Sequence, residues 1–463
     1  MNEDLFRRFF ENKRVALLGF GQEGQSSFRT LKRYLPGLSM VVCDQDPAVE
    51  ELKASFDPGG EADWHLGPAY LEGLGRSDIV IRSPGIPFRV LNPLELKGMV
   101  TSQTDIFLSL FRPHITGITG TKGKSTTAAL LHHVLQTGGL TSILAGNIGI
   151  PPFELIPEME ENTHVVFEMS SHQLQPARIS PHMAVWLNLF AEHLDHYASF
   201  EEYARAKMNI FRWQKAGDFL FYNPADAHIP GLLSRTDIPS TRVLLGRPGD
   251  GATWAAFFEG TDLVLDLPAN GIRIDGLARK RQLPGEHNLI NIAAAAAIAR
   301  IKGVDVASVV RGVESFRGLP HRLEFTGEAN GVSFYNDSIS TVPESTMAAI
   351  KTFPQASALI LGGFDRGVEY GPLMAFLGQS DVKHLVFLGD AGRRMMDTAS
   401  VSGALRTKHC FLAHDFDEAF RQAAGSCQAG EICLLSPAAA SYDSFRNFKE
   451  RGERFRQLVE ALQ

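Results

Sequence analysis

The chain has 463 residues, of which 44% are hydrophobic and 21% are charged, and its formal net charge at pH 7 is −7. A chain this long exceeds one hydrophobic core, so we expect about two to four domains. The acidic balance disfavours a nucleic-acid-binding protein, and the longest apolar run, residues 292–299, is too short to cross a membrane. Four cysteines without C-x-x-C spacing disfavour a disulfide scaffold. We therefore expect a cytoplasmic enzyme.

The first segment, residues 1–102, has the pattern of a nucleotide-binding unit. The apolar run KRVALLG leads into a glycine turn formed by Gly19, Gly21 and Gly24, and a helical stretch follows it. Asp44 lies twenty residues after Gly24, where a Rossmann-type unit places its ribose-binding acid. A tight structural turn would explain the glycines alone. Strand, turn, helix and acid together favour nucleotide binding.

The remaining chain predicts two further α/β domains. Residues 103–318 contain the apolar strands HVVFE and MAVWL, typical of a parallel sheet, and alternating short runs over 252–282 predict a small β-meander. An alanine-rich helix is expected over 288–302, before the candidate linker FRGLPHR. Residues 319–463 again alternate apolar strands with helical patterns. The fold class is therefore α/β with three domains.

The stretch GITGTKGKSTT resembles a phosphate-binding loop with altered spacing, because Ile118 stands where the usual pattern has its first glycine. Gly120 and Gly123 leave backbone N–H groups free to face a phosphate, and the start of a helix adds its dipole. Lys124 can reach terminal phosphates, and the Ser125 hydroxyl can join a Mg²⁺ shell. A flexible turn with a solvated lysine is the alternative.

Three residues after this loop are candidates for metal binding or catalysis. Glu168 ends the apolar run HVVFE, where an α/β ATPase keeps a metal-binding acid, although a helix cap is an equal possibility. His193 follows an apolar strand, where ligands gather in parallel sheets, but a lone histidine is more often structural. Lys207, taken alone, is typical of a solvated helix lysine.

Together these motifs resemble those of a known family. GTKGKST, EMSSHQL, NLFAEHLDHY, ARAKMNIF, GEHNLINIAAAAA, GLPHRLE, YNDSISTVPEST and LSPAAASYDSFRNFKERG occur in this order. The chain resembles the Mur ligases, ATP-dependent enzymes that build the peptide of bacterial cell-wall precursors. GLPHRLE and SFRNFKERG are most similar to the branch that adds glutamate to UDP-N-acetylmuramoyl-L-alanine. The resemblance implies a Rossmann-like UDP-binding domain, a central P-loop ATPase domain and a Rossmann-like amino-acid-binding domain.

The resemblance also implies a reaction and its cofactors. The carboxylate of the nucleotide-sugar substrate attacks the γ-phosphate of ATP, and the amine of glutamate attacks the resulting acyl phosphate. ATP and two Mg²⁺ sites are implied, with Ser125 and Glu168 at one metal and His193 and a carbamylated Lys207 at the other. The expected partners are the two small-molecule substrates, with no nucleic acid and no membrane insertion, and the expected state is a monomer.

The family's site residues fall on matching positions of this chain. The nucleotide site implied by the resemblance comprises Gly120, Thr121, Gly123, Lys124, Ser125, Thr126, Asn288, Asn291, Arg322 and Asp337. The implied catalytic residues are Lys124, Glu168, His193, Lys207 and His321. The implied substrate contacts are Gly21, Asp44, Ser83 and Gly85 for UDP, Asn147 and Ser170 for the muramoyl group, and Thr341, Arg366, Ser441, Tyr442 and Phe448 for glutamate.

Two stretches depart from the family pattern. Gln22 and Glu23 replace the small or hydroxyl residues that relatives often carry near the diphosphate, and Asp46 stands where some have a basic residue. Ile339 replaces the lysine of the common NDSKAT stretch, which removes a cation beside a dianionic amino acid. D-glutamate is the expected substrate, and L-glutamate is the first alternative.

Three other functions remain as alternatives. A folylpolyglutamate synthase would share the altered phosphate loop, but those enzymes begin at the ATPase domain. A nicotinamide-dependent oxidoreductase would explain the first glycine turn and Asp44, but not the second loop with Glu168 and Lys207. A non-catalytic nucleotide-binding protein would not need the complete set of candidate catalytic residues.

Overall fold

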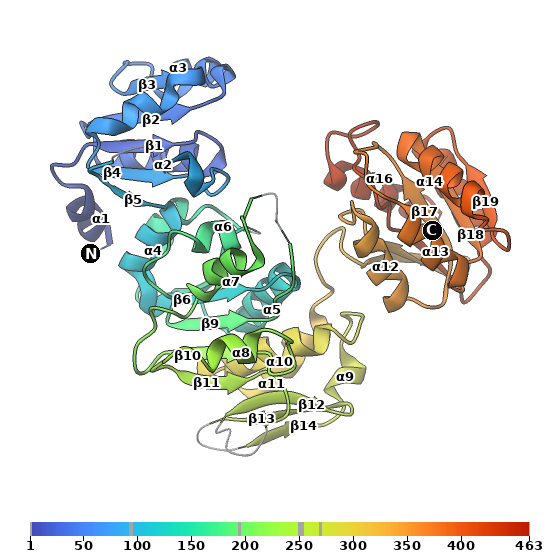
Figure 1. The fold of residues 1–463 in the computed structure, drawn as a ribbon. Helices are drawn as coiled ribbons and strands as arrows, with labels where there is room; N and C mark the ends of the chain where they lie inside the picture. The colour runs from blue at the N-terminus through green and yellow to red at the C-terminus, as the bar shows by residue number, and fades with distance from the viewer. Residues whose placement is uncertain are drawn as a thin grey trace. The chain divides into compact units, whose positions relative to one another are not determined.

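The computed structural model describes residues 2–91, 96–147, 149–192, 196–248, 254–267 and 271–462. It divides into two compact units. The first unit contains Met1–Arg281 with His287–Ser315, and the second contains Gln282–Glu286 with Phe316–Gln463. Figure 1 shows two sheets in the first unit and one in the second.

The first sheet, drawn in blue in Figure 1, is parallel and has the strand order β3-β2-β1-β4-β5. Its strands are β1 (Val15–Leu18), β2 (Met40–Asp44), β3 (Asp63–Leu66), β4 (Ile79–Arg82) and β5 (Met99–Thr101). The helices beside it are α1 (Asn2–Phe10), α2 (Gln22–Tyr34) and α3 (Glu50–Phe56). Apolar side chains bury both faces of β1, which is why the strand is a continuous apolar run.

The glycine turn between β1 and α2 has no room for side chains at two positions. Gly19 has a φ of +92°, and a Cβ there would lie 2.8 Å from the Cβ of Ser83. A Cβ on Gly24 would lie 2.1 Å from the carbonyl oxygen of Gly19. Glycine therefore lets the start of α2 approach the end of β1 closely.

The central sheet is mixed and has the order β14-β13-β12-β11-β10-β9-β6-β8-β7. Its strands are β6 (Ile115–Thr119), β7 (Ser142–Gly146), β8 (His164–Glu168), β9 (Met183–Trp186), β10 (Phe219–Tyr222), β11 (Thr241–Leu244), β12 (Ala255–Glu259), β13 (Asp262–Asp266) and β14 (Ile272–Ile274). The expected meander is present as β12, β13 and β14, which pair antiparallel. It continues the main sheet, because β12 pairs with β11.

Two helices pack against each other next to the phosphate loop. The helices of this region are α4 (Gln103–Phe111), α5 (Lys124–Thr137), α6 (Ser171–Leu174), α7 (Phe200–Met208), α8 (Ile229–Leu233), α9 (Leu277–Lys280), α10 (Asn288–Ile301) and α11 (Val306–Ser315). Helix α10 packs against α5, and its alanines 293–297 are all buried. Small side chains let the two helices approach closely, which places the start of α10 beside the phosphate loop.

The second unit is built on the sheet β15-β16-β20-β17-β18-β19, in which β15 is antiparallel and the other strands are parallel. Its strands are β15 (Glu324–Ala329), β16 (Val332–Asn336), β17 (Ala356–Gly362), β18 (His384–Leu388), β19 (His409–Leu412) and β20 (Ile432–Leu435). Its helices are α12 (Pro343–Thr352), α13 (Gly371–Gln379), α14 (Gly389–Ser402), α15 (Phe416–Ser426) and α16 (Phe448–Glu460). The predicted α/β class is confirmed in all three regions.

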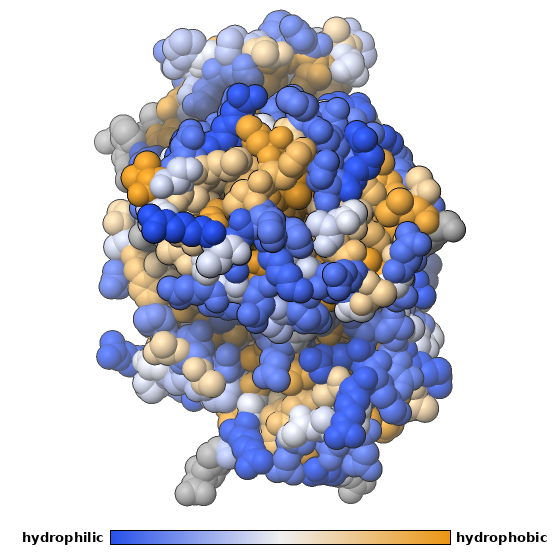
Figure 2. Space-filling model, turned by 90° about the vertical axis from the view of Figure 1, so that its right-hand side faces the viewer, coloured by the Kyte–Doolittle hydropathy of each residue, from blue (hydrophilic) through white to orange (hydrophobic). Residues whose placement is uncertain are grey.

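In the described part of the chain, no helix is long and apolar enough to cross a bilayer. Figure 2 shows hydrophilic residues over much of one face, with scattered hydrophobic patches between them. Scattered apolar residues are ordinary on protein surfaces and do not by themselves mark an interface.

The glycine turn gives a test of stability. We expect G24A to lower the free energy of unfolding by about 2 kcal/mol, because the new methyl group meets a backbone carbonyl that cannot move away cheaply. G21A is the matched control, since a Cβ at Gly21 has no atom within 4 Å. Urea unfolding followed by circular dichroism measures both variants. Equal midpoints would show that the turn adapts to a side chain.

Candidate active site

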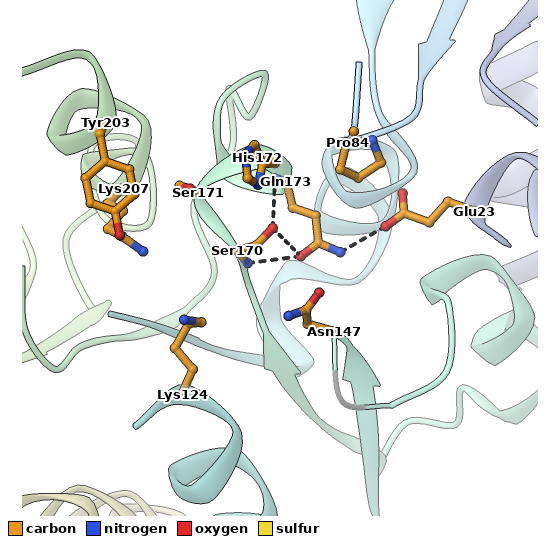
Figure 3. Close-up of a pocket in the computed structure, with 11 residues that line it drawn as sticks. Glu23, Pro84, Lys124, Asn147, Ser170, Ser171, His172, Gln173, Tyr203 and Lys207 are labelled. Carbon is orange, nitrogen blue, oxygen red and sulfur yellow. Dashed lines mark hydrogen bonds between the residues drawn. The ribbon is translucent and has the colours of Figure 1, made fainter. Parts of the chain in front are cut away.

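A cavity of about 320 Å³ lies in the first unit, where the first and central domains meet (Figure 3). It is lined by Glu23, Pro84, Gly85, Lys124, Asn147, Ser170, Ser171, His172, Gln173, Tyr203 and Lys207. Five of these were predicted site residues: Gly85, Lys124, Asn147, Ser170 and Lys207. Segments distant in sequence therefore place a phosphate-loop lysine, a buried lysine and several neutral polar groups around one space.

The phosphate loop joins β6 to α5, at the carboxyl end of the sheet. Gly123 has a φ of +85° and precedes α5, whose first residues are Lys124 and Ser125. The ammonium group of Lys124 donates to the carbonyl oxygens of Gly120 and Thr121, at 3.0 Å each. These bonds hold the lysine against its own loop, in a position from which it can turn to a phosphate.

Asn188 supports this loop, and the sequence reasoning missed it. Its Oδ1 accepts hydrogen bonds from the backbone N–H groups of Thr121 and Lys122, both at 2.9 Å. Its Nδ2 donates to the carbonyl oxygen of Lys122 at 3.0 Å. Asn188 follows β9, next to β6 in the sheet, so strand pairing brings it to the loop. Its position after an apolar strand was the available signal.

Lys207 is buried on α7, where the sequence alone favoured a solvated side chain. Its Nζ donates to the carbonyl oxygen of Gly120 at 2.8 Å and lies 4.9 Å from the centre of the Tyr203 ring. Burial lowers the pKa of Lys207 well below its ordinary value, and the positive charge of Lys124 lowers it further. The charges of Glu192 and Glu168 act in the opposite direction. The site therefore favours a neutral amine at this position.

Glu168 ends β8 and is also buried. Its Oε1 accepts a long hydrogen bond of 3.5 Å from Asn147, and its buried Oε2 has no hydrogen-bond partner among the described residues. A buried carboxylate oxygen without a donor fits a site for a cation. In the described part of the chain, no group of three His, Cys, Asp or Glu residues is placed to hold a metal ion. His193 lies outside the described residues.

Ser170 and Gln173 form a capping box at the start of α6. Gln173 Oε1 accepts from the backbone N–H of Ser170 at 3.0 Å and from its hydroxyl at 3.2 Å. Gln173 Nε2 donates to the carboxylate of Glu23 at 2.9 Å, a bond that Figure 3 shows crossing from the central to the first domain. Gln173 was missed, although S-x-x-Q is a recognised capping pattern.

Two other residues predicted to contact UDP, Asp44 and Ser83, form hydrogen bonds within the first domain. Asp44 accepts from the backbone N–H of Phe20 at 2.6 Å and of Asp46 at 2.8 Å. The hydroxyl of Ser83 donates to the carbonyl oxygen of Gly19 at 3.1 Å. Gly21 is exposed. Asp44 and Ser83 therefore shape the glycine turn, and their contacts with a substrate stay predictions.

The predicted adenine residues lie beside the phosphate loop. Asn291 is buried, accepts from the hydroxyl of Thr127 at 2.9 Å and donates to Asn288 at 2.7 Å. A Cβ at Gly123 would lie 3.1 Å from Asn291 Oδ1, so glycine leaves room for this contact. Thr126 is buried in the first turn of α5. The structure brings these residues together, while their contact with adenine stays a prediction.

In the second unit, the predicted residues surround the carboxyl ends of β16 and β20. Asp337 accepts from the Ser436 hydroxyl at 2.8 Å and from the backbone N–H of Leu323 at 3.2 Å. Burial raises the pKa of Asp337 to about 6, although hydrogen bonds and the charge of Arg322 act against this. His321 has a φ of +63°, and its ring lies against Asn336.

Arg451, which the sequence reasoning missed, holds the loops that carry the predicted glutamate residues. Its buried guanidinium donates to the carbonyl oxygens of Ser338, Ala439 and Ala440, at 2.9 to 3.1 Å. Burial lowers its pKa to about 10. Its position in the motif SFRNFKERG was the available signal.

The predicted glutamate residues lie on or beside these loops. Arg366 donates to the carbonyl oxygen of Thr341 at 2.7 Å, and the hydroxyl of Ser338 donates to the carbonyl of Phe448 at 2.8 Å. Tyr442 is exposed, while Ser441 is buried. The structure thus brings Arg366 to Thr341, while the glutamate contacts of these residues stay predictions.

Comparisons with known proteins give the family. The model of the Mur ligase middle domain matches residues 118–299, and that of the Mur ligase glutamate ligase domain matches residues 321–439. The chain belongs to the Mur ligase family. This Mur ligase is therefore an ATP-dependent enzyme that forms an amide bond. The nicotinamide-oxidoreductase alternative is accordingly set aside.

Relatives match over nearly the whole length. Proteins from Acetivibrio thermocellus and Symbiobacterium thermophilum are each 33% identical, over 99% and 97% of this chain and 98% of their own. Both are named UDP-N-acetylmuramoylalanine--D-glutamate ligase.

Solved structures confirm the fold alone. The UDP-N-acetylmuramate-alanine ligase MurC from Thermotoga maritima covers 98% of this chain and 100% of its own, with a TM-score of 0.57 and 18% identity. E. coli FolC covers 82% of this chain and 99% of its own, with a TM-score of 0.55 and 14% identity.

Asn188 gives a test of the phosphate loop. We expect N188A to raise the KM for ATP about tenfold, because two backbone N–H groups lose the acceptor that orders the loop. The measurement is steady-state ADP formation with ATP varied. N223A is the matched control, since Asn223 follows the neighbouring strand β10 and its Oδ1 accepts from Ala225 N, away from the loop. Equal KM values for both variants would contradict the supporting role.

Proposed function

We propose that this Mur ligase joins D-glutamate to UDP-N-acetylmuramoyl-L-alanine, with release of ADP and phosphate, in the synthesis of peptidoglycan precursors. The observation that carries the proposal is the match at 33% identity, over nearly the whole chain, to relatives named for that reaction. The cavity of the first unit supports it, since the phosphate loop and the first domain both contribute to its walls. A ligase that uses a nucleotide-linked substrate needs both.

The reaction requires anionic groups to approach one another. The carboxylate of the nucleotide-sugar substrate attacks the γ-phosphate of ATP, and the resulting acyl phosphate is attacked by the amine of glutamate. Lys124 would leave the carbonyl oxygens of its own loop and neutralise phosphate oxygens. Asn147 and Ser170, which line the same cavity, would hold the muramoyl part of the substrate by neutral hydrogen bonds.

Mg²⁺ fits the chemistry of the donor set. Glu168 offers a buried carboxylate oxygen without a donor among the described residues. Ser125 directly follows Lys124 at the start of α5. These residues would hold one ion. Bound Mg²⁺ would supply positive charge to the phosphate oxygens. His193 and Lys207 remain the proposed ligands of a second ion.

Lys207 would serve that second ion as a carbamate. An ammonium repels a metal ion, whereas a carbamate offers oxygen ligands of the kind that Mg²⁺ prefers. Carbamate forms when the neutral amine attacks CO₂ and loses a proton, and the lowered pKa of Lys207 keeps more of the amine neutral near pH 7. The same burial that makes a charged lysine costly therefore favours the modification.

The second unit would bind glutamate. Arg366 and Thr341, which are hydrogen-bonded to each other, would face the side-chain carboxylate, with Ser441, Tyr442 and Phe448 around it. His321 would orient the reacting groups, and Arg322 and Asp337 would serve the nucleotide. Ile339, half-buried where the common pattern has lysine, is the reason to keep L-glutamate as the second candidate. We further propose a cytoplasmic, monomeric enzyme.

The first test is phosphate release with ATP, Mg²⁺ and UDP-N-acetylmuramoyl-L-alanine, run in parallel with D-glutamate and L-glutamate. We expect release with D-glutamate and at least about tenfold less with L-glutamate, because one pocket fits both carboxylates of only one enantiomer well. The product is identified by mass spectrometry and chiral amino-acid analysis. Release with L-glutamate alone would keep the reaction and reverse the handedness. No release with either would reject the proposed acceptor or donor.

Carbamylation of Lys207 gives an independent test. We expect wild-type activity to fall in CO₂-depleted buffer at pH 6 and to return on addition of bicarbonate at pH 8, because a rising pH increases the neutral amine that CO₂ requires. K207R is expected to lose at least about 100-fold in kcat under both conditions, since a guanidinium forms no such carbamate. K215R, at an exposed lysine after α7, is the control. Activity of K207R equal to wild type would exclude this role.

A further inference from the structure

Glu23 brings a negatively charged side chain to a cavity proposed to bind a diphosphate. It lies in the first turn of α2, and Figure 3 shows its carboxylate among the groups around the cavity. Its Oε1 accepts from Gln173 Nε2 at 2.9 Å. Its Oε2 is buried, and no donor reaches it from any residue that the structure describes. Glu23 thus lines the cavity and carries one oxygen that no donor among the described residues satisfies.

The orientation of Gln173 is fixed by its other bonds. Its Oε1 accepts from both the backbone N–H and the hydroxyl of Ser170. Its amide NH₂ group must therefore face Glu23, which accepts it. As a carboxylate, Glu23 then has acceptor positions only, and the free one at Oε2 requires a donor.

A second hydrogen bond joins the first domain to α6. Arg82 is fully buried at the end of β4 and donates to the carbonyl oxygens of Pro84 at 3.4 Å and His172 at 3.2 Å. Pro84 and His172 line the same cavity as Glu23. Arg82 and Glu23 both belong to the first domain, and they bond to consecutive residues of α6, His172 and Gln173. These two bonds join the first domain to the central domain.

A phosphate group is a poor partner for this oxygen. Phosphate oxygens and an ionised carboxylate are both negative and both accept hydrogen bonds, so they repel each other at contact. The start of α2 offers backbone N–H groups and a helix dipole for the diphosphate instead. Burial raises the pKa of Glu23, whereas the bond from Gln173 and the charge of Arg82 act against this. A protonated Glu23 donating to phosphate is therefore the competing arrangement.

We propose that Glu23 determines specificity for the nucleotide-sugar substrate, with Oε2 accepting a hydrogen bond from one of its neutral hydroxyl or amide N–H groups. This inference rests on the proposed function, because it assumes a nucleotide-linked sugar in the cavity. It explains how Glu23 can lie beside the turn proposed to bind the diphosphate without repelling the substrate, because its free oxygen contacts a neutral group. A free acceptor selects ligands that carry a donor at that point and rejects those that do not.

The variant E23Q tests the proposal directly. Gln173 still presents its NH₂ group, so the new amide turns its oxygen toward Gln173 and places its own NH₂ group where Oε2 was. The free acceptor becomes a donor with almost no change in shape. We expect the KM for UDP-N-acetylmuramoyl-L-alanine to rise at least about tenfold, with kcat and the KM for ATP changed by less than about twofold.

The double variant E23Q/Q173E supplies a rescue. A carboxylate at position 173 still accepts from the N–H and hydroxyl of Ser170, and it also accepts from the NH₂ group of the amide at position 23. The amide oxygen then faces the cavity, so the acceptor and the net charge are both restored. We expect the KM to return to within about threefold of wild type. E51Q, which removes an exposed charge on α3, is the control and should match wild type.

The outcomes separate the hypotheses. A lower KM in E23Q would overturn the proposal in favour of protonated Glu23 donating to phosphate, because the amide mimics that donor. An unchanged KM would overturn it by showing that the substrate does not contact Oε2. A raised KM in both E23Q and the double variant would reduce Glu23 to a structural role. An inactive wild type would overturn the proposed function, and this inference with it.

Discussion

The central domain depends on how two lysines share the space beside one loop. Lys124 and Lys207 both donate to the carbonyl oxygen of Gly120, and Lys207 does so from a buried position. Burial lowers the pKa of Lys207, and the positive charge of the neighbouring Lys124 lowers it further. The loop thus holds two lysines, and the buried one, Lys207, has its pKa lowered by its surroundings. This difference supports the distinct roles proposed for them.

Another feature of the first unit is a pair of buried carboxylate oxygens that accept no hydrogen bond from the described residues. Glu168 Oε2 and Glu23 Oε2 are both buried without a hydrogen-bond partner among the described residues. Such groups are costly in a folded protein unless a ligand satisfies them. The surrounding hydrogen bonds fix their direction, through Asn147 for Glu168 and Gln173 for Glu23. We infer that these two unsatisfied oxygens lower the stability of the first unit without ligands. A cation would satisfy Glu168, and a hydrogen-bond donor would satisfy Glu23.

The second unit also contains buried charged side chains, one cationic and one acidic. Arg451 is a buried cation that donates to backbone carbonyls and so fixes the loops around Ser338 and Ala440. Asp337 is a buried acid whose pKa rises to about 6 even though several groups donate to it. Charged side chains in this unit therefore hold loop geometry from inside, and leave Arg366 and Tyr442 nearer the surface to meet a ligand.

The sequence by itself determined the α/β class, the glycine turn, the phosphate loop and the extent of α10, because local patterns of apolar residues and glycines specify strands, turns and helices. It also identified Lys124 and Ser170, which stand in motifs. Only the tertiary structure decided that Lys207 is buried, that Asn188 and Arg451 support loops, and that Glu23 meets Gln173 across two domains. Those facts depend on strand order and on contacts between residues far apart in sequence, such as Asn188 with Thr121, 67 positions apart, and Glu23 with Gln173, 150 positions apart. No local pattern encodes such contacts.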